Sequence, residues 1–201
     1  MDINRKYRTI TREQFLFHEM RIVARLLDEG MDENKVLEEI VNNNLFQYPT
    51  ERMIKNIASV CLNRFKETNS KELIHIVATE SSDVAKQACL FLMMNYYRLV
   101  WDFMITVIGE KYRTKDSSFT KMDLNSFFTR LQEQNDVVAS WSDATINKCK
   151  QVLKKTMVET GYLDSTKSEV LNPVLLDSSL KEVIENINCK EALVAFGGMY
   201  A

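Results

Sequence analysis

The sequence has few of the residues that make tight turns. It contains five glycines and two prolines among 201 residues. Strands connected by short loops depend on Gly, Pro and Asn at those loops, so their scarcity favours helices. The hydrophobic content of 45% is sufficient for a packed core. We therefore predict an all-α chain.

The sequence also lacks the spacings that metal sites require. The four cysteines are scattered, without a CxxC pair: Cys61, Cys89, Cys149 and Cys189. The two histidines, His18 and His75, are far apart and form no HxxxH pattern. We expect no metal site and no cofactor. Buried, free thiols in a reducing compartment are the expected state of the cysteines, with disulfides or metal ligation as the alternatives.

Only one long apolar run is present. The N-terminal MDINRKYRTITRE is polar and predicts no signal peptide. Residues 88–108 include 17 apolar or aromatic side chains, and this length would suit a membrane span. However, Arg98 and Asp102 interrupt the run, each costing roughly 2.5–3.5 kcal/mol at a bilayer centre, and their spacing lets them pair on one helix face. We expect a buried central helix within 81–110, no membrane partner and a cytoplasmic location, with the membrane span as the alternative.

Capped amphipathic segments fill most of the chain. Thr11 and Gln14 resemble a capping box, and Ser142 resembles an N-cap whose helix ends at Gly161. Helical periodicity is seen in the following ranges: 12–30, 31–44, 50–67, 70–80, 81–110, 121–134, 142–161 and 179–196.

The C-terminal half differs in its order of elements. A helix, a connector, a second helix and then two short extended runs within 162–176 form the order of a winged helix-turn-helix, in which the hairpin is the wing. We therefore predict an N-terminal helical bundle over 1–112 and a winged-helix-like domain with one short β-hairpin over 113–201.

The helix predicted at 142–161 has two different faces. At 100° per residue, Ile146, Cys149, Leu153 and Met157 share the side that packs on a core. Amides can recognise adenine edges and lysines can neutralise phosphates. The candidate DNA-binding residues of this helix and of the wing tip are Asn147, Lys148, Lys150, Gln151, Lys154, Lys155 and Lys167.

Local charge supports a nucleic-acid partner. Residues 111–155 contain nine Lys and Arg against five Asp and Glu, although the whole chain has a net charge of -2. A basic N-terminal arm adds Arg5, Lys6 and Arg8, which could track phosphates. We predict contacts with duplex DNA, with RNA as the other nucleic acid that such a surface could bind. A merely solvated lysine face is the alternative.

Two stretches resemble a known protein family. They are FLFHEMRIVARLLDEG through VLEEIVNNNLFQYPTERMIKNIASVCLNRF, and WSDATINKCKQVLKKTMVETGYLDS followed by LNPVLL. These stretches, within about 15–65 and 120–190, resemble the BrxA family of bacterial BREX phage-exclusion systems. The resemblance implies an all-helical fold likened to the RNA-binding antiterminator NusB. It also implies a non-enzymatic role in defence beside other BREX proteins, namely a methyltransferase, an ATPase and an alkaline-phosphatase-like protein.

Two further functions remain open. A protein-binding adaptor could use a partner-facing stripe formed by Met93, Met94, Tyr96, Tyr97 and Trp101. An enzyme would need catalytic side chains, but Glu110, Asp116 and Asp123 show neither a paired-carboxylate spacing nor a nucleophile and base. We therefore predict no catalytic residues and no small-molecule substrate.

Overall fold

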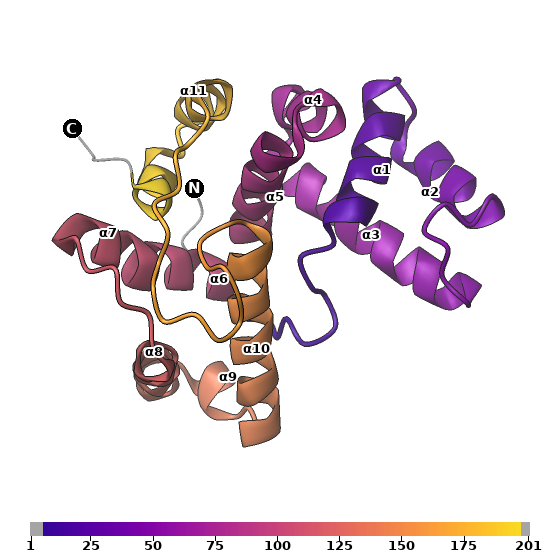
Figure 1. Cartoon of the computed structure of the whole chain (residues 1–201). Coiled ribbons are helices and arrows are strands. Elements are labelled where there is room, and N and C mark those ends of the chain that lie inside the picture. Colours follow the sequence, from indigo (N-terminus) through magenta and orange to yellow (C-terminus); the bar gives the residue numbers. More distant parts are fainter. Residues whose placement is uncertain (1–5, 198–201) are drawn as a thin grey trace. The chain divides into compact units, whose positions relative to one another are not determined.

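A computed structural model describes residues 6–197, which fold into helices joined by loops (Figure 1). The chain divides into two compact units, one formed by Phe15–Tyr96 and one formed by Met1–Gln14 together with Tyr97–Ala201. The described residues form eleven α-helices, one π-helix and one 3-10 helix, with no strand among them. The predicted all-α class is confirmed, whereas the predicted division at residue 112 stays a prediction.

The unit of residues 15–96 is a bundle built around its last helix. Its helices are α1 (Phe17–Asp28), α2 (Glu33–Asn42), α3 (Glu51–Thr68), α4 (Lys71–Thr79) and α5 (Ser82–Tyr96). α1 packs against α3 and α4, and α5 packs against the same two helices. Every residue from Ala88 to Asn95 is buried. The apolar run is therefore core, as its sequence predicted.

Local capping sets the start of most helices in this unit. Asp32 accepts hydrogen bonds from two backbone N–H groups of α2, and Thr50 and Ser70 cap α3 and α4. α1 is the exception. The predicted capping box of Thr11 and Gln14 is wrong, because Leu16 adopts a left-handed conformation and the helix begins after it without a side-chain cap.

The predicted central helix is interrupted. Tyr97 has an extended backbone, and α6 (Arg98–Phe103) begins after it. The chain continues as a π-helix, η1 (Met104–Gly109), and then as α7 (Glu110–Thr114). Within residues 6–197, no helix combines the length and apolarity that a membrane crossing requires. The predicted ion pair is confirmed, since Arg98 Nε lies 3.4 Å from Asp102 Oδ2.

The other unit surrounds an aromatic cluster. After α7 its helices are α8 (Lys121–Gln134), α9 (Asp136–Ala139), α10 (Asp143–Glu159), α11 (Ser178–Asn186) and the 3-10 helix η2 (Lys190–Phe196). The ring centroid of Phe103 lies 6.1 Å from that of Phe119 and 5.5 Å from that of Phe127, both edge-on. Phe128 packs on Phe127 at 5.4 Å. These rings join α6 to the start and the middle of α8.

The predicted hairpin over 162–176 is wrong. Backbone pairing of its second run goes to a distant segment, because Val170 bridges Ser118 and the Leu171 N–H donates to the Ser117 carbonyl at 2.7 Å. The two runs share one backbone bond, from the Asn172 N–H to the Tyr162 carbonyl at 2.9 Å. Residues 162–172 therefore form a closed loop, with no wing of paired strands.

Candidate nucleic-acid interface

α10 carries the charged face that the sequence predicted. Ser142 caps the helix by accepting a hydrogen bond from the Thr145 N–H at 3.2 Å. The expected inner face is confirmed, and the buried residues of the helix are Ile146, Cys149, Val152, Leu153, Thr156 and Met157. The exposed residues that alternate with them are Asn147, Lys148, Gln151 and Lys155. Two amides and two ammonium groups therefore face solvent along this helix.

Two lysines lie at the flank of α10, on aromatic rings. Lys150 Nζ donates to Asn125 Oδ1 at 2.8 Å and lies 5.6 Å from the ring centroid of Phe128. Lys154 Nζ lies 6.0 Å from the ring centroid of Phe119. Both side chains are half-buried. Lys154 was predicted as a fully exposed DNA-binding residue, but its ammonium lies over the ring of Phe119.

The N-terminal arm lies beside this helix. Arg5 is outside the described residues, while Lys6 and Arg8 are exposed. The Ile10 backbone is hydrogen-bonded to Cys149, and Gln14 Oε1 accepts from Lys155 Nζ at 3.1 Å. Figure 1 shows this indigo segment passing α10.

Chain lengths are consistent with that path. Four residues of extended chain span about 13 Å, and the six residues from Cys149 to Lys155 rise about 9 Å along a helix. Arg12, which is exposed, lies between the two contact points. Two segments that carry basic residues and are more than 100 positions apart in the sequence thus meet at Cys149 and Lys155.

Lys167 lies in the closed loop of residues 162–172. Its side chain is exposed, and its N–H donates to Ser165 Oγ at 3.2 Å. Asn172 closes the loop by donating from Nδ2 to the Gly161 carbonyl at 3.1 Å and to Asp164 Oδ1 at 2.8 Å. The loop therefore carries one exposed cation, Lys167, on a backbone held by these hydrogen bonds. The sequence predicted this residue at the tip of a wing.

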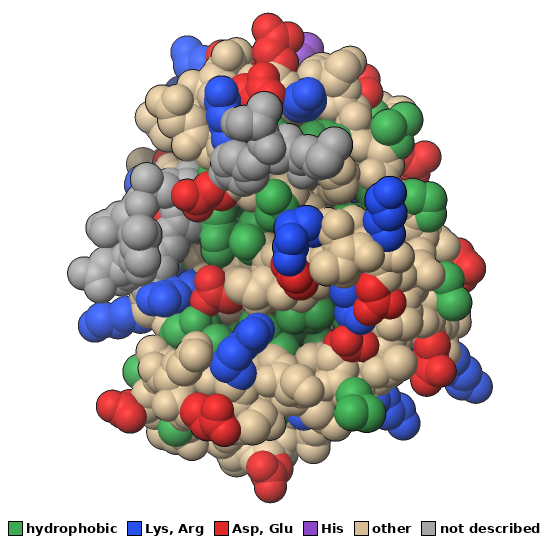
Figure 2. Space-filling model, turned by 90° about the vertical axis from the view of Figure 1, so that its left-hand side faces the viewer, with side chains coloured by type: hydrophobic (Ala, Val, Ile, Leu, Met, Phe, Trp, Pro, Cys, Tyr) green, Lys and Arg blue, Asp and Glu red, His purple; other side chains and the backbone are tan. Residues whose placement is uncertain are grey.

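Charge of both signs covers another part of the surface. On the face drawn in Figure 2, Lys and Arg side chains are interspersed with Asp and Glu, and hydrophobic side chains show in the hollows between them. The described part of this face therefore offers no field of a single sign. Support for a polyanionic partner comes from α10 and the arm.

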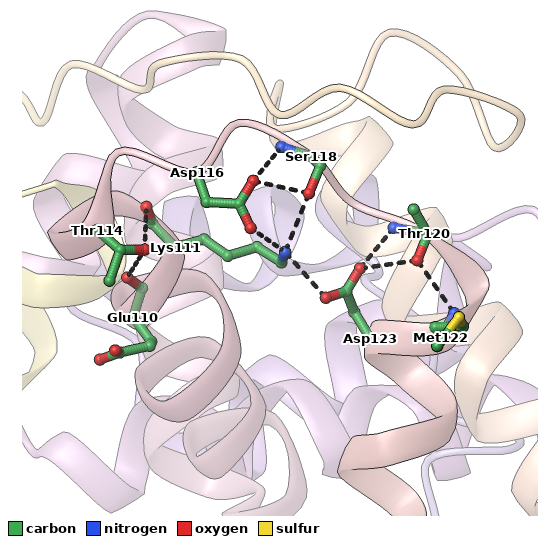
Figure 3. A network of polar contacts seen from close by, with 8 residues as sticks. All are labelled: Glu110, Lys111, Thr114, Asp116, Ser118, Thr120, Met122 and Asp123. Carbon is green, nitrogen blue, oxygen red and sulfur yellow. Dashed lines mark hydrogen bonds and ion pairs between the residues drawn. The ribbon is translucent and has the colours of Figure 1, made fainter.

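Two of the three carboxylates considered for catalysis, those of Asp116 and Asp123, belong to one polar network around Lys111 (Figure 3). Lys111 Nζ lies 2.8 Å from Asp116 Oδ2 and 2.9 Å from Asp123 Oδ1. Asp123 also accepts from the Thr120 N–H and completes a capping box at the start of α8. Glu110 pairs with Arg113 at 2.6 Å. The spacing of Asp116 and Asp123 in the sequence did not predict this cluster, because it is the Lys111 ammonium that brings the two carboxylates together in the fold.

The pKa shifts in this network do not favour general acid–base catalysis. The Lys111 ammonium and the Ser118 hydroxyl and N–H hold the pKa of Asp116 well below its usual range. Burial raises the pKa of Asp123, but hydrogen bonds from Lys111 and Thr120 outweigh it and lower the net value. Burial lowers the pKa of Lys111, yet the two aspartates raise the net value. A general acid or base needs a pKa near the working pH, and these groups are shifted away from it.

A cleft of about 530 Å³ opens beside the network. Its charged groups already have partners within the protein: Lys111 holds two aspartates, and Arg130 Nη2 donates to Thr106 Oγ1 at 3.3 Å. The residues described contain no cluster of His, Cys, Asp and Glu that could hold a metal ion. The cleft therefore points to no particular ligand.

The predicted adaptor stripe is mostly core. Met93 and Met94 are fully buried and Tyr97 is 2% exposed, while Tyr96 and Trp101 are half-buried. All four cysteines are buried and free, as the sequence predicted.

Comparison with known proteins identifies the family. A family model described as BrxA matches residues 5–188. A BREX protein BrxA of Bacillus cereus (strain H3081.97) is 35% identical over 195 residues, which cover 96% of this chain and 92% of the relative. The chain belongs to the BrxA family. The resemblance drawn from the sequence motifs is thus confirmed.

More distant members of the family cover similar lengths. A BREX protein BrxA of Escherichia coli O9:H4 (strain HS) is 27% identical, with 90% of this chain and 84% of the relative covered. The chain also resembles the crystal structure of an uncharacterized protein from Magnetospirillum magneticum, with a TM-score of 0.81 at 23% identity. That likeness covers 96% of this chain and 98% of the other, and it shows the fold alone. The expected likeness to NusB stays a prediction.

Proposed function

We propose that this protein is a non-enzymatic component of a BREX phage-defence system, acts beside other BREX proteins and binds duplex DNA. Family membership supports the first part, because the relatives are BREX proteins. The DNA-binding part rests on one observation: the basic N-terminal segment contacts α10 at the buried Cys149 and at Lys155, which belongs to the exposed, lysine-bearing face.

Phosphate contacts would supply most of the affinity. Lys148 and Lys155 on α10 and Lys6, Arg8 and Arg12 on the arm are exposed cations. Lys150 and Lys154 lie at the flank of α10, and Lys167 is a further exposed cation on the closed loop. Each phosphate that is neutralised releases counterions, so such binding weakens steeply with salt. Asn147 and Gln151 are the side chains placed to contact base edges.

The test removes charge from α10 without removing its packing. The variant Lys148→Gln/Lys154→Gln/Lys155→Gln removes three charges and leaves the buried face of α10 unchanged. Each lysine–phosphate ion pair that is removed lowers the slope of log affinity against log salt by about 0.9. We expect weaker binding of a duplex and a slope reduced by about 2.7 when all three lysines pair with phosphates in the unmodified protein.

A matched control changes the same charge elsewhere. Lys35, Lys66 and Lys71 are exposed on α2, α3 and α4 of the other unit. Their replacement by Gln should leave the slope close to that of the unmodified protein. If the two triple variants behave alike, or if the α10 variant is folded and binds unchanged, α10 is not the DNA surface. Single-stranded RNA and DNA of the same length, titrated in parallel, distinguish the nucleic acids.

The adaptor function is the second candidate, on a new observation. Leu175 is 91% exposed and Val170 is 58% exposed, and both lie in or just after the closed loop of the α10 unit. Exposed aliphatic side chains of this kind occur at protein-binding surfaces. Loss of binding to another BREX protein in Leu175→Asp, together with unchanged DNA titrations in every variant above, would favour it.

A further inference from the structure

The N-terminal arm is anchored at four points. Tyr7 is 8% exposed, and its hydroxyl donates to Asp102 on α6. Ile10 is fully buried and is hydrogen-bonded to Cys149, while the Glu13 carboxylate accepts from the Tyr97 hydroxyl. Gln14 accepts from Lys155. Three basic residues lie between and beside the anchors: Lys6, Arg8 and Arg12.

Tyr7 is the outermost of these anchors. The Arg98 guanidinium lies 4.7 Å from the centroid of the Tyr7 ring and 3.4 Å from Asp102 through Nε. Burial, and then the Asp102 carboxylate, raise the pKa of Tyr7 to about 12, so its hydroxyl remains a hydrogen-bond donor at physiological pH. The ring is thus held by a cation on one side and by an anion at its tip.

Such anchoring lowers the conformational entropy that is lost when the arm binds a nucleic acid. Ordering a free chain costs conformational entropy, and that cost is subtracted from the affinity whenever a segment is ordered on binding. An arm that is already held along α10 does not incur this cost again. Its cations are also spaced before any nucleic acid arrives.

We propose that Tyr7 is a positioning residue for nucleic-acid binding: its hydroxyl, on Asp102, holds the arm so that Lys6, Arg8 and Arg12 meet phosphates together with α10. This inference rests on the proposed function. It assigns Tyr7 no contact with the nucleic acid itself.

The test is a double-mutant cycle on duplex affinity. Tyr7→Phe keeps the ring over Arg98 and removes only the hydroxyl bond to a charged group, so we expect affinity to fall on the order of tenfold, with a smaller salt slope. In the background Lys6→Ala/Arg8→Ala/Arg12→Ala, Tyr7→Phe should have no further effect. A merely structural role would lower affinity equally in both backgrounds. Tyr48→Phe is the matched control, because the Tyr48 hydroxyl donates to Glu19 in the other unit.

A second readout does not depend on nucleic acid. Trypsin cuts after Arg8 and Arg12, and release of the arm in Tyr7→Phe should make both sites several-fold faster to cut. The proposal is supported if trypsin cuts Tyr7→Phe faster than the unmodified protein and if the affinity losses of Tyr7→Phe and of the arm substitutions are non-additive. If the protein binds duplex but Tyr7→Phe binds with unchanged or higher affinity, the proposal is wrong while the proposed function stands. If the unmodified protein binds no duplex, both fail.

Discussion

Lys111 connects two aspartates that would otherwise repel each other. Its side chain is 10% exposed, and its ammonium lies 2.8 Å from one carboxylate and 2.9 Å from the other. These ion pairs fix the short connection between α7 and α8, from which the Phe119 N–H donates to the Glu169 carbonyl at 2.8 Å. At the scale of single residues, this network supports the segment on which Lys154 rests.

Acid should weaken this network. The folded pKa values of Asp116 and Asp123 lie below the ordinary value of about 4. The unfolded chain therefore binds more protons in that range, so the contribution to stability is complete above about pH 4 to 5 and is lost as pH falls toward the folded values.

Asp123→Asn tests that contribution. It removes the charge opposite Lys111 and weakens the cap of α8, so we expect a loss of about 1–2 kcal/mol at pH 7. Urea unfolding between pH 7 and pH 3 should show a shallower decline for this variant than for the unmodified protein. Glu133→Gln, at an exposed carboxylate on the same helix, is the control. An unchanged pH dependence in Asp123→Asn would contradict the assignment.

At the scale of elements, the sequence predicted what neighbouring residues decide. Ser142 caps its helix as expected, because a cap needs only the next three residues. The buried face of α10 followed from periodicity alone.

Distant contacts decided the elements that the sequence did not predict. Thr11 and Gln14 form no capping box, since the segment before α1 is held by α6 and α10. The hairpin is absent because Val170 pairs with Ser118. For the same reason, no local sequence pattern predicted the contact between the arm and α10. The basic residues of the arm and those of α10 were each predicted separately.

Gly109 determines how closely η1 and η2 approach each other. A Cβ at this position would lie 2.9 Å from Val194 Cγ2, so η2 can pack on η1 only where a side chain is absent. Such crowding costs about 1–3 kcal/mol, and the helix preference of Ala over Gly returns up to about 1 kcal/mol.

Gly109→Ala should therefore destabilise the protein by about 1–2 kcal/mol in chemical denaturation. In the background Val194→Ala, which removes the clashing methyl groups, the same change should be neutral or slightly stabilising. An equal loss in both backgrounds would show that Val194 is not the cause.

At the scale of the whole molecule, the family of the chain is known. The new observation is that the basic N-terminal arm contacts α10. The net charge of -2 gives no overall attraction to a polyanion. The proposed binding to DNA must therefore come from local charge, here six cations from two distant parts of the sequence: Lys6, Arg8, Arg12, Lys148, Lys154 and Lys155. The charges themselves are visible in the sequence, and the structure adds the contact of the arm with α10 at Cys149 and Lys155.

The most direct test is the salt dependence of duplex binding by the unmodified protein. If the six cations contact phosphates, log affinity should fall against log salt with a slope of about -5. Neutralising the arm and α10 together should bring the slope close to zero while the helical circular-dichroism spectrum is unchanged. Absence of duplex binding at low salt, or a steep slope that survives neutralisation of all six, would contradict the account.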